Sequence, residues 1–127
     1  MFKLPQARVV TFDVDDTMLM WEPEKYEHTP EELLCFTDEY GQWHLLPHVN
    51  HVMFMRKLKQ QGYGIVLWSA AGTDWAEKAA EMLKIEDLVD VCMSKPEFAV
   101  DDLLEAKRII KSVIWLDPVT GDFKRSE

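Results

Sequence analysis

Three carboxylates follow a short apolar run near the N-terminus. Residues 9–12 are β-branched or aromatic, and Asp13, Asp15 and Asp16 come directly after them, with Thr17 next. The run predicts a strand that is buried on both faces, as in a parallel sheet covered by helices. The acidic side chains then lie at the carboxyl end of that strand, where open α/β sheets bind their ligands. Because like charges this close repel one another, we expect a cation among them, and Mg2+ suits oxygen ligands and a substrate phosphate.

A second apolar run ends in a hydroxyl. Residues 64–69 predict a buried strand that ends at Ser69, and a loop of small residues leads into a helix predicted over residues 75–84. A hydroxyl at a strand end, beside a helix N-terminus, can hold a phosphoryl oxygen. Residues 88–92 predict a third, short strand.

The segment between these two strands predicts a loop, a hairpin and one helix. Residues 22–32 are polar and bounded by prolines, which indicates a loop. Residues 33–37 and 42–46 are β-prone runs on either side of a glycine-containing turn, which predicts a β-hairpin. Residues 47–61 have the apolar spacing of an amphipathic helix that ends at Gly62.

The spacing Asp13-x-Asp15-x-Thr17 after apolar residues resembles the first motif of the haloacid dehalogenase-like superfamily, most of whose members are phosphatases. The resemblance implies a Rossmann-like α/β fold with a central, mostly parallel sheet, helices on both faces and a β-hairpin flap beside the site. Because one loop, one hairpin and one helix fill the space before the second motif, we expect no cap domain. The chain then forms a single domain over residues 1–127, similar to the capless, magnesium-dependent phosphatase-like branch.

The resemblance also implies roles for individual side chains. Asp13 would be the nucleophile that forms an aspartyl-phosphate, and Asp15 the general acid and base. Ser69 matches the second motif and Lys95 the third, and both would hold the transferring phosphoryl group. Trp21 follows the first motif closely enough to contact a substrate.

The C-terminal third allows two interpretations of the fourth motif, which completes the metal site. In the first, residues 98–100 are a strand and Asp101 and Asp102 are the acidic pair, so Mg2+ is bound by Asp13, the Asp15 carbonyl, Asp101 and Asp102, and a helix covers residues 103–111. In the second, residues 94–97 form a capping box and one long helix reaches residue 111, and the motif is made by Asp117 and Asp122. Both interpretations place a strand at residues 113–116.

We prefer the first interpretation, because the second leaves the sheet one strand short. The run Ser-Lys-Pro, a few apolar residues and Asp-Asp also resembles small members of the superfamily. Six residues separate Lys95 from Asp101, up to about 20 Å in an extended chain. Lys95 then reaches the site only if the chain bends back around Pro96.

Composition narrows the choice of partner and location. The net charge of −9 over 127 residues opposes nucleic-acid binding, and the lysines and arginines form no basic stripe. A small phosphorylated substrate is therefore the expected partner. No apolar run is long enough to span a membrane, and the first residues lack an apolar signal core, so we expect a cytoplasmic protein. The sequence does not determine the oligomeric state or the substrate.

Two further features bear on function. The spacing of His44, His48 and His51 matches no zinc pattern, and Pro47 prevents one helix from carrying all three. Clustered aspartates, a hydroxyl and a lysine also occur in receiver-like phosphoacceptor domains, which bind partners without turnover. A non-catalytic phosphate-binding module on a related fold is a third possibility, which the presence of every motif residue disfavours.

Overall fold

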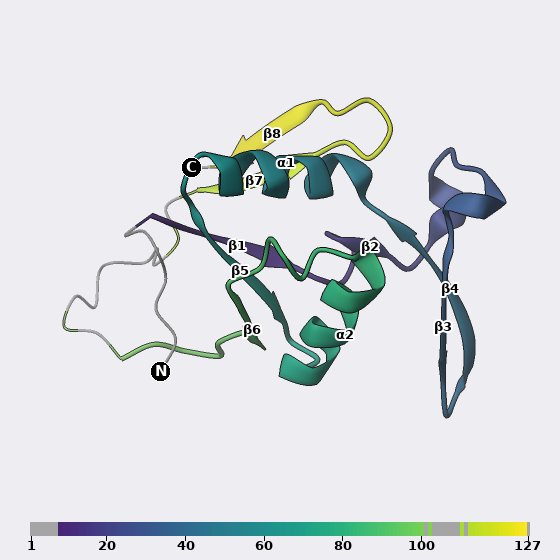
Figure 1. Ribbon diagram of the computed structural model, residues 1–127, viewed down its shortest axis with the longest axis horizontal. Helices are drawn as coiled ribbons and strands as arrows, with labels where there is room; N and C mark the ends of the chain where they lie inside the picture. The colour runs from purple at the N-terminus through teal and green to yellow at the C-terminus, as the bar shows by residue number, and fades with distance from the viewer. Residues whose placement is uncertain (1–7, 101, 103–109, 111, 127) are drawn as a thin grey trace.

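A three-stranded parallel sheet lies at the centre of the chain (Figure 1). The computed structural model describes residues 8–100, 102, 110 and 112–126, which form a mixed α/β structure. The sheet has the order β1-β5-β6, with bounds Val9–Asp13, Gly64–Ser69 and Val91–Ser94. Asp13 pairs with Trp68, and Ser69 pairs with Ser94. The carboxyl ends of all three strands therefore meet at one edge, as the sequence predicted for the first two.

The two described helices pack on the same face of this sheet. They are α1 (Val49–Gln60) and α2 (Thr73–Leu83), and both bounds agree closely with the predicted helices. Ile65 and Leu67, alternate residues of β5, join one buried cluster with side chains from both helices. The prediction of helices on both faces is not tested, because the further helix predicted over residues 103–111 falls almost entirely outside the described residues. Neither described helix is long and apolar enough to cross a membrane.

The first strand, β1, is less buried than predicted, whereas the neighbouring strand β5 is buried on both faces. β5 is buried along most of its length, whereas Val9 of β1 is 42 % exposed and Phe12 is buried. The reason is position, because β5 is the central strand among the described three and β1 lies at the edge. Burying a side chain such as Leu67 stabilises the fold by about 2 kcal/mol, so β5 contributes most of the sheet's share of the core.

The predicted hairpin is present. Its strands are β3 (Leu34–Asp38) and β4 (Gly41–Pro47), and β4 also pairs with the short β2 (Leu19–Met20). The preceding loop contains two short 3-10 helices, η1 (Pro23–Lys25) and η2 (Pro30–Glu32). Figure 1 shows the tip of the hairpin projecting away from the parallel sheet.

A second hairpin lies at the C-terminal end of the chain. β7 (Val113–Leu116) has the predicted bounds, but it pairs antiparallel with β8 (Phe123–Ser126) and not with the central sheet. The predicted strand is therefore confirmed, but it does not join the central sheet as a Rossmann-like fold would require. The hairpin runs alongside α1 in Figure 1, because backbone groups of Leu116 bond to histidine rings of that helix and its N-cap.

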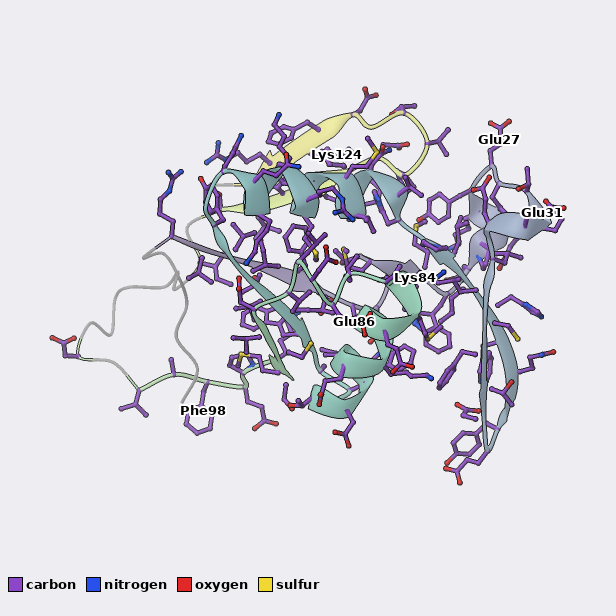
Figure 2. The ribbon with its side chains drawn as sticks, viewed as in Figure 1. Glu27, Glu31, Lys84, Glu86, Phe98 and Lys124 are labelled. Carbon is purple, nitrogen blue, oxygen red and sulfur yellow. The ribbon has the colours of Figure 1, made fainter. Side chains whose placement is uncertain are left out.

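The segment after β6 differs from both interpretations. Residues 95–100 form neither the predicted strand nor the start of a long helix. Phe98 is 80 % exposed and Val100 is 94 % exposed, and Figure 2 shows Phe98 pointing away from the sheet. No described strand lies beside this segment to pair with its backbone. The helix predicted over residues 103–111 lies outside the described residues, apart from Ile110 in a bend.

The third strand lies three residues later than its predicted start. Leu88 is buried, but its N–H donates to Ile85 in a turn, and pairing with β5 begins only at Val91. The apolar character of Leu88 reflects burial in that turn, which a pattern of apolar residues does not separate from burial in a strand. The shift moves the end of β6 to Ser94, directly before Lys95.

Candidate active site

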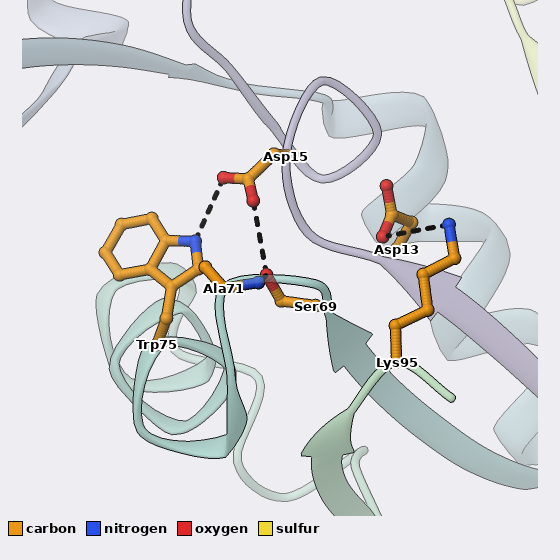
Figure 3. A network of polar contacts seen from close by, with 6 residues as sticks. All are labelled: Asp13, Asp15, Ser69, Ala71, Trp75 and Lys95. Atoms are coloured by element: carbon orange, nitrogen blue, oxygen red, sulfur yellow. Dashed lines mark hydrogen bonds and ion pairs between the residues drawn. The ribbon is translucent and has the colours of Figure 1, made fainter. Parts of the chain in front are cut away.

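Asp13 and Lys95 lie side by side at the carboxyl edge of the sheet. The Lys95 ammonium nitrogen is 3.8 Å from Oδ1 of Asp13 (Figure 3). Lys95 directly follows β6, and its backbone N–H donates to the Ser69 carbonyl at 2.9 Å. Because β6 ends at Ser94, Lys95 reaches this edge through the sheet itself. Lys95 therefore reaches Asp13 without the bend around Pro96 that was predicted from the sequence.

The Asp13 carboxylate is partly withdrawn from solvent. Burial raises its pKa above the usual value, the Lys95 ammonium opposes that rise, and the neighbouring Asp15 charge adds to it. Its side chain is still 33 % exposed, so an outside group can reach it. The result is an accessible carboxylate that is poorly hydrated and flanked by one cation.

The loop after Asp13 is a tight turn held by its own backbone. The Val14 carbonyl accepts N–H groups from Thr17, Met18 and Leu19, and both Val14 and Met18 are fully buried. Asp16 has a positive φ of 60°, a left-handed conformation that aspartate tolerates better than most residues. Its Oδ1 accepts the backbone N–H of Trp21. Asp16 and Thr17 therefore stabilise the turn.

The Asp15 carboxylate is held by three side-chain donors. Oδ1 accepts the indole N–H of Trp21 at 2.8 Å and that of Trp75 at 2.9 Å. Oδ2 accepts the Ser69 hydroxyl at 3.2 Å. Figure 3 shows Asp15 between Trp75 and Ser69, with Asp13 and Lys95 as a separate pair nearby. The two motif carboxylates thus have different partners, one a cation and the other neutral donors.

Ser69 occupies a more enclosed position than its predicted role implies. It is fully buried, and its hydroxyl oxygen accepts the Ala71 N–H at 3.0 Å while its proton goes to Asp15. A hydroxyl has a single proton to donate. Ser69 therefore orients Asp15 in this arrangement, and it has to turn away from Asp15 before it can donate to a phosphoryl oxygen.

Acidic partners from the C-terminal third are only partly described. Asp101 lies outside the described residues, and Asp102 lies in an exposed bend. Asp117 Oδ1 accepts the backbone N–H groups of Val119 and Thr120 within its own turn, and these bonds lower its pKa. The carboxylate of Asp117 is thus engaged in shaping the β7–β8 turn.

The described oxygen atoms are of the type that binds a hard cation such as Mg2+. They are too few to fill the coordination shell of such an ion. Within the described residues, no three His, Cys, Asp or Glu side chains are grouped as metal ligands. The Asp13 carboxylate offers oxygen ligands, and the Asp15 carbonyl accepts no hydrogen bond from any described residue. Oxygen donors of this type match Mg2+ and not a softer metal.

Sequence reasoning did not identify the bond from Trp75 to Asp15. Trp21 was expected near a substrate, and Trp75 was expected only as the start of a helix. One signal was available, because Trp75 stands in the first turn of the helix that follows the second motif. That position directs a long side chain toward the edge where Asp15 lies.

Comparisons with known proteins assign no family to this chain. No family model, curated protein or solved structure with which it was compared matches it. Functional inference therefore depends on the geometry of the four residues Asp13, Asp15, Ser69 and Lys95.

Proposed function

We propose that the protein is a magnesium-dependent phosphatase that hydrolyses a small phosphomonoester through an aspartyl-phosphate on Asp13. One observation carries the proposal: Asp13, Asp15, Ser69 and Lys95 come from three separate strand ends and lie together at one sheet edge. A nucleophile, a proton donor and a cation within one cluster are the groups that phosphate-ester hydrolysis requires. The parallel order β1-β5-β6 and the hairpin support a capless Rossmann-like fold of the haloacid dehalogenase-like type.

The residues would act in two steps. In the first, an Asp13 oxygen bonds to phosphorus, the ester P–O bond breaks, and Asp15 gives its proton to the leaving oxygen. In the second, Asp15 takes a proton from a water molecule that bonds to phosphorus, and the bond from phosphorus to Asp13 breaks. The Lys95 ammonium offsets the charge of the phosphoryl oxygens throughout.

Mg2+ fits the donor set of this site. Asp13 and the Asp15 carbonyl would hold it, with Asp101 and Asp102 as the further ligands that the motif resemblance implies. When bound, the ion supplies the positive charge that lets a carboxylate approach a phosphate dianion.

Phosphate release from p-nitrophenyl phosphate tests the proposal directly. We expect many turnovers per protein molecule with Mg2+, none after treatment with EDTA, and recovery when Mg2+ is added back. A panel of phosphorylated sugars, nucleotides and amino acids then ranks the substrates. Activity that is indifferent to EDTA would contradict the need for a cation at the crowded carboxylates.

A second experiment separates a phosphatase from a receiver-like phosphoacceptor. A receiver takes up one phosphoryl group per molecule from a small phosphodonor and then stops. Mass spectrometry after incubation with acetyl phosphate would detect that single addition. Stable phosphorylation without turnover would replace the proposed function.

A further inference from the structure

We infer that Trp21 and Trp75 are positioning residues that determine which oxygen of Asp15 carries the transferred proton. The inference rests on the proposed phosphatase function, in which Asp15 is the general acid and base. Both indole N–H groups donate to the same oxygen, Oδ1, at 2.8 and 2.9 Å. Neither the Asp-x-Asp motif nor the second motif includes these two residues.

The assignment follows from the number of acceptor positions on a carboxylate. Each carboxylate oxygen has two lone pairs, so two N–H donors fill the capacity of Oδ1. Among the described residues, Oδ2 accepts only the Ser69 hydroxyl, so one of its lone pairs is not used by any of them. A proton on Asp15 therefore resides on Oδ2.

Indole groups suit this task because they only donate. The Nε1–H of tryptophan has no acceptor lone pair, so it cannot reverse its role when the carboxylate gains or loses a proton. A water molecule or a hydroxyl in the same place could donate or accept and would let the proton move to Oδ1. Trp21 follows β2 and Trp75 belongs to α2, so the donors approach from two independent elements.

The hairpin holds both indoles in place. Phe36 of β3 and Trp43 of β4 are opposite each other in the hairpin register. The Trp43 ring contacts Trp21 edge-on, with centroids 5.8 Å apart, and the Phe36 ring lies 4.9 Å from Trp75. One cross-strand aromatic pair thus packs against each donor, which restrains the orientation of both rings.

This arrangement predicts a specific catalytic defect when either indole N–H is removed. A proton must reach the leaving oxygen when an alkoxide departs, whereas p-nitrophenolate leaves readily without one. If the Asp15 proton is no longer positioned, hydrolysis of an alkyl ester should therefore slow far more than hydrolysis of p-nitrophenyl phosphate. A general structural defect would slow both substrates alike.

The experiment compares Trp21→Phe, Trp75→Phe and the double variant with Trp115→Phe, using benzyl phosphate and p-nitrophenyl phosphate with Mg2+. Trp115 is the matched control, because its ring packs edge-on against His48 and His51, and its indole N–H is not among the described donors to Asp15. We expect kcat for benzyl phosphate to fall about tenfold or more in each single variant. We expect kcat for p-nitrophenyl phosphate to fall less than about threefold, and KM to stay near the wild-type value for both substrates.

Two outcomes would overturn the inference while leaving the phosphatase proposal intact. They are an equal loss on both substrates in active Trp21 and Trp75 variants, and the same selective loss in Trp115→Phe. A wild-type protein that is inactive on both esters would instead overturn the proposed function and this inference with it.

A measurement without turnover checks the geometry itself. The chain has five tryptophans, so a nitrogen–proton NMR spectrum resolves five indole N–H signals. Asp15→Ala removes the acceptor and should shift the signals of Trp21 and Trp75 while that of Trp115 stays in place. Unchanged Trp21 and Trp75 signals would show that the indoles do not bond to Asp15 and would overturn the inference.

Discussion

Asp13 and Lys95 form an ion pair whose geometry suits chemistry better than stability. Their charged atoms are 3.8 Å apart, and the two side chains are 33 % and 47 % exposed. Pairs this exposed contribute at most about 1 kcal/mol to folding. Burial nevertheless raises the pKa of Asp13 despite the nearby ammonium. For an acid whose pKa is raised by folding, the contribution to stability decreases as pH rises through that pKa, so the Asp13 charge is a cost at neutral pH.

Replacing Asp13 by Asn should therefore separate activity from stability. We expect turnover to fall by about a thousandfold or more, because the amide is a poor nucleophile. The melting temperature should stay the same or rise, because a partly buried charge is removed. Steady-state kinetics and thermal unfolding monitored by circular dichroism measure the two effects.

The control for this variant is Asp16→Asn. It removes one charge from the same cluster, but Asn keeps an oxygen for the Trp21 N–H and tolerates the positive φ. Activity near that of the wild type is expected. If Asp13→Asn were as active as Asp16→Asn, Asp13 would not be the nucleophile.

The β7–β8 hairpin is attached to α1 by two stacked histidines. Their ring centroids are 3.5 Å apart, and both rings are buried. His48 Nδ1 accepts the His51 N–H, so its Nε2 donates to the Leu116 carbonyl at 2.6 Å. His51 Nε2 accepts the Leu116 N–H, so its Nδ1 donates to the Thr17 carbonyl at 2.7 Å. All four ring nitrogens are satisfied only when both rings are neutral.

Acid should loosen this attachment. Burial lowers the pKa of His48 and lowers that of His51 to about 4, with the neighbouring His48 adding to the effect at His51. The unfolded chain then binds protons more tightly than the native state, so stability falls as pH drops from about 6.5 to about 4. We expect a loss of about 3 kcal/mol from His51 alone over that range. Urea unfolding at several pH values measures it.

Variants at two histidines show whether His51 is the cause. His51→Gln removes the titrating ring and should flatten the dependence of unfolding free energy on pH. His44→Gln alters an exposed histidine of β4 and should leave the slope unchanged. Equal slopes for the wild type and His51→Gln would assign the acid sensitivity to other groups.

The two candidate positions of the fourth motif predict different variant effects. The Asp117 carboxylate accepts two backbone N–H groups within its own turn, those of Val119 and Thr120. Asp117→Ala should therefore lower the melting temperature of the protein with little change in its Mg2+ requirement. Asp101→Ala should raise the Mg2+ concentration needed for half-maximal activity far more. Titration of activity with Mg2+ compares them, and the reverse order would place the motif at Asp117.

The whole molecule carries a charge that favours cation binding. The net charge is −9, Figure 2 shows Glu27 and Glu31 directed outward, and Glu86 is also exposed. Self-repulsion of this kind disfavours the compact state, and it is strongest where carboxylates are crowded, as at Asp13. A divalent ion bound at Asp13 would relieve the repulsion there and would therefore favour the folded chain.

Mg2+ should consequently stabilise the protein. Saturation at about a hundredfold excess over the dissociation constant adds about 2.7 kcal/mol, which raises the melting temperature by several degrees. NaCl at equal ionic strength is the control for general screening. We expect Asp13→Asn to lose most of the Mg2+ effect, measured by differential scanning fluorimetry. A shift that NaCl reproduces, or that Asp13→Asn retains, would argue against a specific site at Asp13.

The local sequence determined those strands and helices that a few neighbouring residues are enough to predict. Residues 64–69 form a strand with the predicted bounds, because a continuous apolar run stands between a glycine turn and a small-residue loop. Residues 113–116 also form a strand with the predicted bounds. The turn residues predicted the β3–β4 hairpin, and the apolar spacing predicted both helices. The positions of Asp13 and Ser69 at strand ends also follow from the sequence.

Tertiary structure alone decided which partners these elements meet. β7 pairs with β8 and packs on α1, Lys95 reaches Asp13, and Trp75 bonds to Asp15 across 60 positions of chain. The hydrogen-bond partner of a strand and the direction of a long side chain depend on contacts between distant segments, which a short apolar pattern does not encode. The sequence thus supplied the reactive groups, and packing between distant elements set the partner that each group faces.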